Sequence, residues 1–209
     1  MSESIIFREF KEADRSELEQ VIRETWCYDR FCTPKTAAQL ANVYLSSCLA
    51  NQTYTQIALV DNVPVGIIMG KNRASHKCPF SLQLKKIKAI VKLMISKEGR
   101  SVSKIFGGIN GIDKELLNLC PTNYQGELAF FAIRQNCRGK GIGKALFQKV
   151  VEYMRSQKIQ NFYLFTDTSC NYGFYEHQGM KRKQEKKYYF DVNGLPEEMT
   201  FFLYDYVCD

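Results

Sequence analysis

The residues best suited to chemistry lie in one short loop, whose sequence is CRGKGIGKALF at positions 137–147. Three glycines and three basic side chains occupy seven consecutive positions, 138–144, just ahead of an apolar helical pattern. Glycine lets backbone N–H groups approach a ligand closely, and the N-terminus of a helix carries partial positive charge. The loop therefore predicts a site for a phosphate or pyrophosphate, with the cap of an ordinary helix as the plainer alternative.

Two common phosphate-binding patterns are excluded by the residues of this loop. A Walker loop needs glycine at position 138 and serine or threonine at position 145, where this chain has arginine and alanine. A dinucleotide fingerprint needs two residues and then a glycine after Gly141, but Ile142 is followed directly by Gly143. The ligand must be recognised in another way.

The loop needs a strand and a helix to hold it. Residues 126–133, GELAFFAI, predict a buried strand before the loop, and residues 145–156 predict a helix after it. A strand at 161–168 and a short helix at 171–178, ended by Gly179, follow. This order of elements predicts a mixed α/β fold.

The remaining segments also alternate between strand and helix patterns. The chain closes with strands at 186–192 and 199–207, joined through Asn193-Gly194 and Pro196. The earlier part predicts a strand at 4–10, helices at 15–26 and 33–50, and two strands within 54–70 around the turn Asp61-Asn62.

Composition bounds the class of protein. The chain has 209 residues, of which 45% are hydrophobic, so it is long and apolar enough to fold as one globular domain. Its eight cysteines include no C-x-x-C pair, which argues against a zinc or dithiol site, and we expect no metal. The charged N-terminal residues and the lack of a long apolar run predict a cytoplasmic protein.

The segment Arg138-Gly-Lys-Gly141-Ile-Gly143 resembles the Arg/Gln-x-x-Gly-x-Gly/Ala motif of the GNAT superfamily of N-acetyltransferases. That family uses the motif to hold the pyrophosphate of acetyl-CoA. A second signature is similar too: Asn171, then Tyr175 four residues before Gly179. The resemblance implies a mixed, mostly antiparallel and splayed central sheet flanked by helices. It covers residues 1–209 as one domain, except for an inserted, basic, helical segment at about 72–123.

The resemblance also implies the residues that bind acetyl-CoA as co-substrate. The end of the strand before the loop would meet the pantetheine arm, the loop would meet the pyrophosphate, and the second signature would contribute an asparagine. These positions are Phe131, Ala132, Ile133, Arg138, Gly139, Lys140, Gly141, Ile142, Gly143, Lys144 and Asn171.

The implied reaction is direct attack of an amine on the thioester through a tetrahedral intermediate. Most amines are protonated at neutral pH, so a base is needed, and Glu127 stands where some family members carry a catalytic glutamate. Burial in an apolar strand would raise its pKa toward a useful value; alternatively, Glu127 lies at a solvated strand end, or water suffices. Tyr175 resembles the general acid of the family, and the alternative is that it is only a packed aromatic. Tyr172 is a weaker substitute for the acid.

The positive charge is concentrated in one segment. The chain carries a net charge of +7, and residues 71–104 contain ten Lys or Arg against the single acid Glu98. Within 84–97, one helical face would hold Ile87, Ile90, Val91 and Met94, and the opposite face Lys85, Lys88 and Lys92. We favour a helix with solvated lysines that packs over the domain and could roof the acceptor site. The alternative is contact with a membrane surface, nucleic acid or the phosphates of CoA.

The acceptor is not readable from the sequence. The link between the first two helices could form its pocket, with Trp26, Tyr28 and Phe31 as walls and Asp29 as the partner of a cationic amine. Alternatively, these are core and cap residues. A basic protein repels polybasic tails, so we expect a small-molecule amine rather than a protein, and no nucleic acid. The second class of function is a non-catalytic binding module that acts through its basic helix on an acidic partner.

Overall fold

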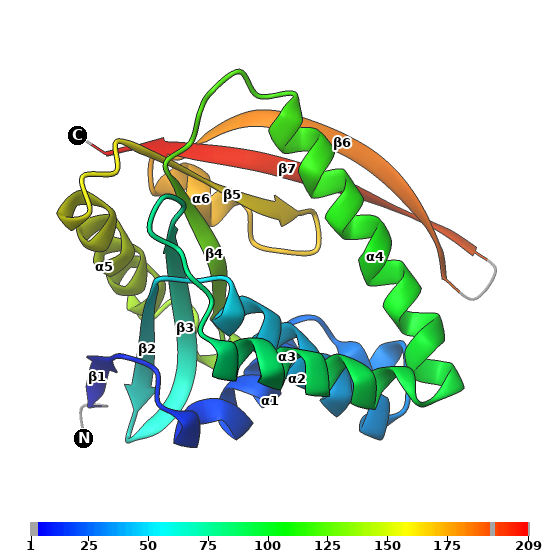
Figure 1. Cartoon of the computed structure of the whole chain (residues 1–209). Coiled ribbons are helices and arrows are strands. Elements are labelled where there is room, and N and C mark those ends of the chain that lie inside the picture. Colours follow the sequence, from blue (N-terminus) through cyan, green and yellow to red (C-terminus); the bar gives the residue numbers. More distant parts are fainter. Residues whose placement is uncertain (1–3, 193–194, 209) are drawn as a thin grey trace.

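A single seven-stranded sheet organises the chain. The computed structural model describes residues 4–192 and 195–208. The strands lie in the order β1-β2-β3-β4-β5-β7-β6, and every neighbouring pair is antiparallel except β4 and β5 (Figure 1). The predicted fold class is confirmed. The strands are β1 (Ile5–Arg8), β2 (Tyr54–Val60), β3 (Val63–Asn72), β4 (Gly126–Ile133), β5 (Asn161–Asp167), β6 (Lys181–Val192) and β7 (Leu195–Val207).

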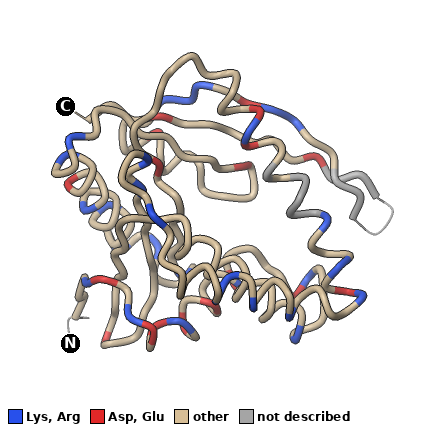
Figure 2. Tube along the Cα trace, in the orientation of Figure 1, with Lys and Arg blue, Asp and Glu red and all other residues tan. Residues whose placement is uncertain are grey.

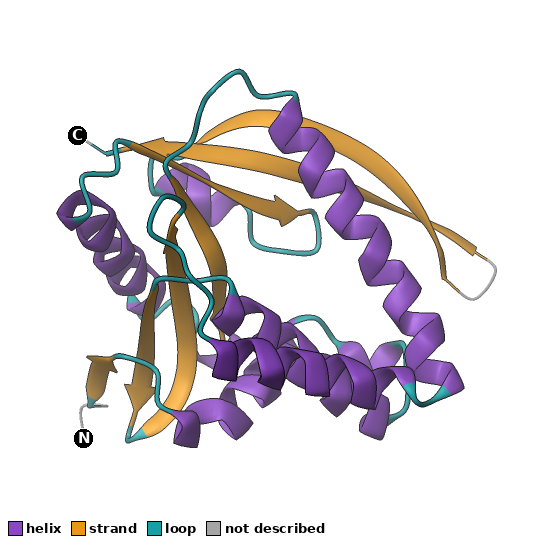
Figure 3. Ribbon diagram, viewed as in Figure 1, coloured by secondary structure: helices purple, strands orange, loops and turns teal. Residues whose placement is uncertain are grey.

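The sheet is divided where β4 meets β5. These two strands pair at only two positions, Gly126 with Phe162 and Glu127 with Tyr163. Beyond Glu127 they diverge, so β4 keeps its pairing to β3 but has no strand along its other edge (Figure 3). Peptide groups on that edge of β4 are therefore available to a ligand, since backbone N–H and C=O groups require hydrogen-bond partners.

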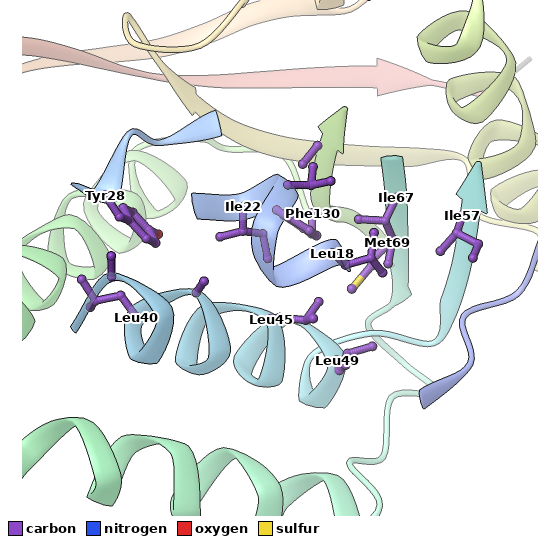
Figure 4. Close-up of a cluster of buried hydrophobic side chains, with 14 of the residues drawn as sticks. Leu18, Ile22, Tyr28, Leu40, Leu45, Leu49, Ile57, Ile67, Met69 and Phe130 are labelled. Atoms are coloured by element: carbon purple, nitrogen blue, oxygen red, sulfur yellow. The ribbon is translucent and has the colours of Figure 1, made fainter. Parts of the chain in front are cut away.

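Helices cover both faces of the sheet. α1 (Arg15–Thr25) and α2 (Pro34–Ala50) pack on one face, whereas α5 (Ile142–Ser156) packs on the other. Leu18 and Ile22 of α1 recur at helical spacing and are fully buried against Met69 and Phe130 (Figure 4). Burying each such side chain contributes roughly 1.5–3 kcal/mol to stability. α6 (Gly173–His177) is a single short turn after β5.

Two further helices connect β3 to β4. α3 (Phe80–Met94) packs on α2, and α4 (Lys97–Asn118) rises from it to β7, where Ile112 and Leu116 join Tyr163 and Leu203 in a separate cluster (Figure 1). The buried residues of α3 are Ala89 and Leu93. The face predicted to be apolar, with Ile87 and Val91, is exposed. Among the described residues, no helix is long and apolar enough to cross a membrane.

Turn chemistry explains where some strands end. Asp61 and Asn62 take the predicted turn between β2 and β3, with φ of 49° and 66°, values that aspartate and asparagine tolerate better than most residues. The closing strands β6 and β7 are longer than predicted. Residues 193 and 194 of their predicted connection lie outside the described residues.

Candidate active site

The glycine loop leaves the end of β4 and leads into α5. A short 3-10 helix at 135–137 follows β4, and Gly139 and Gly141 then have φ of 78° and 79°. These are left-handed conformations that residues with a side chain rarely adopt, which explains glycine at both positions. A Cβ at either position would meet no atom within 4 Å. The backbone of the loop is therefore open to a ligand on this side.

Charge and free donors make the loop suitable for an anion. The first amides of α5 have no carbonyl partner within the helix, and the helix dipole adds positive potential there. Arg138, Lys140 and Lys144 are exposed around them. Arg138 also donates from Nε to the carbonyl oxygen of Ile133 at 3.2 Å, which ties the loop to the end of β4. The arrangement fits a pyrophosphate.

Not every residue predicted to bind acetyl-CoA can contact a ligand through its side chain. Ile142, the first residue of α5, and Ala132 of β4 are buried in the core, so only their backbone groups remain available. At Gly143 a Cβ would lie 3.2 Å from Cδ1 of Ile133 and 3.3 Å from Cε2 of Phe174. Gly143 therefore allows α5 to pack closely against β4 and α6.

Tyr175 lies across the divided sheet from the end of β4. Its ring packs edge-on to Phe131 at a centroid distance of 6.4 Å and also contacts Phe174 and Tyr204. Burial, followed by the nearby Cys170 and Asp167, raises the pKa of Tyr175 above its ordinary value. Its hydroxyl makes no hydrogen bond to another described residue. Asn171 is exposed, and its carbonyl accepts from the backbone N–H of Phe174 at the start of α6.

Glu127 lies at the last point where β4 and β5 are joined. Its side chain is only 14% exposed, so it is not a solvated carboxylate at the start of a strand. Oε2 lies 3.5 Å from Nζ of Lys71 on β3, and the hydroxyl of Tyr163 on β5 lies beside the same carboxylate. Lys71 also donates to Oδ1 of Asn51 at 2.6 Å. Glu127 is thus a largely buried, ion-paired carboxylate.

Asp113 on α4 is a second carboxyl group in this region, which the sequence analysis did not single out. Burial, together with the negative charges of Asp167 and Glu127, raises its pKa to about 7. It has no hydrogen bond or ion pair to another described residue. The sequence did carry a signal, because Asp113 interrupts the apolar spacing of Ile109, Ile112 and Leu116 on one helical face.

Of the predicted walls of an acceptor pocket between α1 and α2, Trp26 and Tyr28 pack in the core, whereas Phe31 is exposed. Asp29 accepts from Nε of Arg23 at 2.6 Å, and this pairing lowers the pKa of Asp29. Tyr28 is buried, while Trp26 stacks on Phe130 at 5.8 Å. The carboxylate expected to meet an amine is therefore already paired with an arginine.

The chain is similar to known proteins in its sequence pattern and in its fold. Residues 18–180 match the model of the acetyltransferase (GNAT) family. No curated protein matches the chain. Three similar solved structures are an N-acetyltransferase from Staphylococcus aureus Mu50, the acetyltransferase of GNAT family from Streptococcus pneumoniae, and the ribosomal-protein-S18-alanine N-acetyltransferase from Escherichia coli.

These similarities extend over nearly whole chains at low sequence identity. The S. aureus protein is 11% identical with a TM-score of 0.56, and 99% of each chain is covered. The S. pneumoniae protein is 14% identical with a TM-score of 0.54, covering 99% of this chain and 100% of that one. The E. coli enzyme is 9% identical with a TM-score of 0.54, covering 99% and 95%. At such identities the likeness establishes the fold alone.

Proposed function

The chain belongs to the acetyltransferase (GNAT) family, and on that premise we propose that it moves an acetyl group from acetyl-CoA to a primary amine. Acetyl transfer from acetyl-CoA is the chemistry of the family; the primary amine is our inference. The observation that carries the proposal is the open glycine loop, with Gly139 and Gly141 in left-handed conformations at the start of α5, beside the unpaired edge of β4.

We assign the binding of acetyl-CoA to three places. The amides of the loop, with Arg138, Lys140 and Lys144, would hold the pyrophosphate. The free edge of β4 at Phe131, Ala132 and Ile133 would receive the pantetheine arm, and Asn171 would border it from the start of α6. Acetyl-CoA supplies the activated acyl group when it is bound, and we propose no metal.

Glu127 is the proposed base, acting directly or through water. Its position between Lys71 and Tyr163 holds the carboxylate in one orientation, which favours proton transfer at a fixed site. Asp113 competes for this role, because a carboxyl group with a pKa of about 7 suits proton transfer at neutral pH. The two are distinguished by the pH dependence of turnover in variants of each.

Tyr175 is the proposed acid for the departing thiolate. Because its pKa is raised, the phenol stays protonated at neutral pH and can donate to a thiolate that lies beside it. Its hydroxyl has no partner among the described residues, so it is free to face a ligand.

The proposed acceptor is a small-molecule amine. Asp113, Glu127 and Asp167 concentrate negative charge near the divided sheet, which favours a cationic amine over a neutral one. The net charge of +7 disfavours a polybasic protein tail. We treat the chain as one domain in which α3 and α4 belong to an insertion at about 72–123.

Two measurements test the function. Calorimetric titration with acetyl-CoA should show one site per chain, and a screen of amines should then release free CoA. Saturable binding without release for any amine would favour the alternative, a binding module that has kept the fold. Absence of acetyl-CoA binding by the folded chain would overturn the proposal.

A further inference from the structure

An apolar stripe runs along the outer side of α3. Phe80, Leu84, Ile87, Ile90, Val91 and Met94, with Ile95 just beyond the helix, are between 39 and 80% exposed. The helix contacts the domain through Ala89 and Leu93, which lie on a different side. Exposed apolar residues gathered on one face of a helix mark a place of contact with a partner or a membrane.

Lysines border the stripe on both sides. At 100° per residue, Lys86 falls on one flank and Lys88 and Lys92 on the other, and no acidic residue occurs between Phe80 and Ile95. None of these three lysines forms an ion pair with another described residue. Figure 2 shows the basic residues of α3 along its length.

A cationic hollow adjoins the flank of Lys88 and Lys92. It has a volume of about 270 Å³, and Arg15 and Lys85 join these two lysines in its lining. Glu12 is the only acid in the lining; it pairs with Arg15 at 2.6 Å and with Lys85 at 2.9 Å. Arg15 also pairs with Glu19 at 3.5 Å, outside the lining. Lys88 and Lys92 have no acidic partner among the described residues, so the hollow can accept a further anionic group.

We propose that α3 binds the surface of an anionic lipid bilayer, with its apolar stripe at the acyl boundary, the flanking lysines among the headgroups and a lipid phosphate in the hollow. An amphipathic helix with basic flanks combines the two attractions that such a surface offers. The charge argues against a second copy, because a symmetric contact would bring two lysine-rich faces together. The apolar stripe argues against nucleic acid, which binds chiefly through its phosphates.

Vesicle flotation of the full chain, without acetyl-CoA, tests the proposal independently of the proposed enzyme activity. The chain should float with vesicles of phosphatidylcholine and phosphatidylserine, bind vesicles of phosphatidylcholine alone at least tenfold more weakly, and detach as salt is raised. Lack of binding to the anionic vesicles would overturn the proposal.

Matched variants separate the helix from overall charge. Lys88→Glu with Lys92→Glu should weaken binding by tenfold or more, since each basic residue near the surface contributes roughly fivefold. The control, Lys35→Glu with Lys181→Glu, replaces two exposed lysines outside α3 and changes the net charge by the same amount. It should weaken binding to the vesicles much less. Equal losses in both double variants would reduce the interaction to net charge and contradict the assignment.

The apolar contribution has its own test. Ile87→Ser with Val91→Ser should lower binding to anionic vesicles by tenfold or more, while Val207→Ser, at another exposed apolar position, should not. If sedimentation instead reveals a dimer that Ile87→Ser dissociates, the stripe belongs to a contact between copies. Binding to an acidic protein but not to vesicles would likewise reject the lipid assignment.

Discussion

Glu127 and Lys71 lie directly opposite each other on β4 and β3, with Oε2 of the glutamate 3.5 Å from Nζ of the lysine. On its other side Glu127 is the register partner of Tyr163 in β5. The carboxylate therefore belongs to the last row in which all three strands are joined. Its position is set by the sheet, and not by a mobile loop, as a group that transfers protons requires.

We expect Glu127→Gln to lower turnover by about 10²–10⁴ at neutral pH, because glutamine cannot take a proton from the amine. Part of the loss should be recovered at high pH, where the amine loses its proton to solvent. Steady-state rates from pH 6 to 10 with an identified acceptor would measure this. Asp113→Asn is the comparison: if it reproduces the loss and Glu127→Gln does not, Asp113 is the base.

Tyr175→Phe should separate binding from chemistry. Phenylalanine keeps the ring contacts with Phe131 and Tyr204, so the affinity for acetyl-CoA should stay within a few-fold of the parent value. Turnover should fall by an order of magnitude or more, because the proton offered to the thiolate is lost. Unchanged turnover would make Tyr175 a packed aromatic and leave Tyr172 or water as the acid.

Gly141→Trp should abolish close approach of a pyrophosphate to the loop and weaken acetyl-CoA binding by tenfold or more. The left-handed φ of Gly141 adds local strain, so circular dichroism must first establish that the variant folds. Gly111→Trp is a matched control, since a Cβ at that position of α4 also meets no atom within 4 Å. An unchanged dissociation constant in folded Gly141→Trp would rule out the loop as the binding site.

Asp113 should make stability depend on pH. Its pKa is raised from 3.8 to about 7, so between these values the folded chain holds a proton that the unfolded chain has released. Its contribution to the free energy of unfolding therefore falls as pH rises through this window and is constant above it.

The corresponding variant gives a direct measurement. Asp113→Asn should melt at a higher temperature than the parent at pH 8, where the buried charge is costly, and the difference should be clearly smaller at pH 5, inside the titration window. Asp61→Asn, which removes an exposed carboxylate from the β2–β3 turn, should not reproduce this difference. The same shift at both pH values would mean that Asp113 is not the group that titrates.

Local patterns in the sequence were sufficient for most elements and for the glycine loop. The turn at Asp61-Asn62, the strand before the loop and the helix after it each depend on neighbours in the chain. The family resemblance supplied the mixed, mostly antiparallel character of the sheet, but not its strand order. Asp113 was not predicted because its pKa is set by burial in the fold, and then by the charges of Asp167 on β5 and Glu127 on β4. A single sequence cannot show that carboxyl groups from three separate elements lie near enough to affect one another.

The acceptor and the role of the basic helix could not be predicted from the sequence for a related reason. Asp29 would be a suitable partner for an amine only if Arg23 did not already pair with it. The left-handed residue Cys27 turns the chain so that Arg23 and Asp29 meet. On α3 the periodicity correctly grouped Ile87 with Val91, but it could not tell which face the domain would cover. Helical spacing defines which residues share a face, and tertiary packing decides whether that face is exposed to solvent.

The two residue pairs that join β4 to β5 have a consequence for cooperativity. They are the only strand-to-strand link, within the described chain, between a half-sheet of β1 to β4 and a half-sheet of β5 to β7. A ligand lying along the free edge of β4 and against α6 would span both halves as an additional strand does. Its binding energy would then enter the unfolding of each half, and their amide protons should become slower to exchange with solvent together.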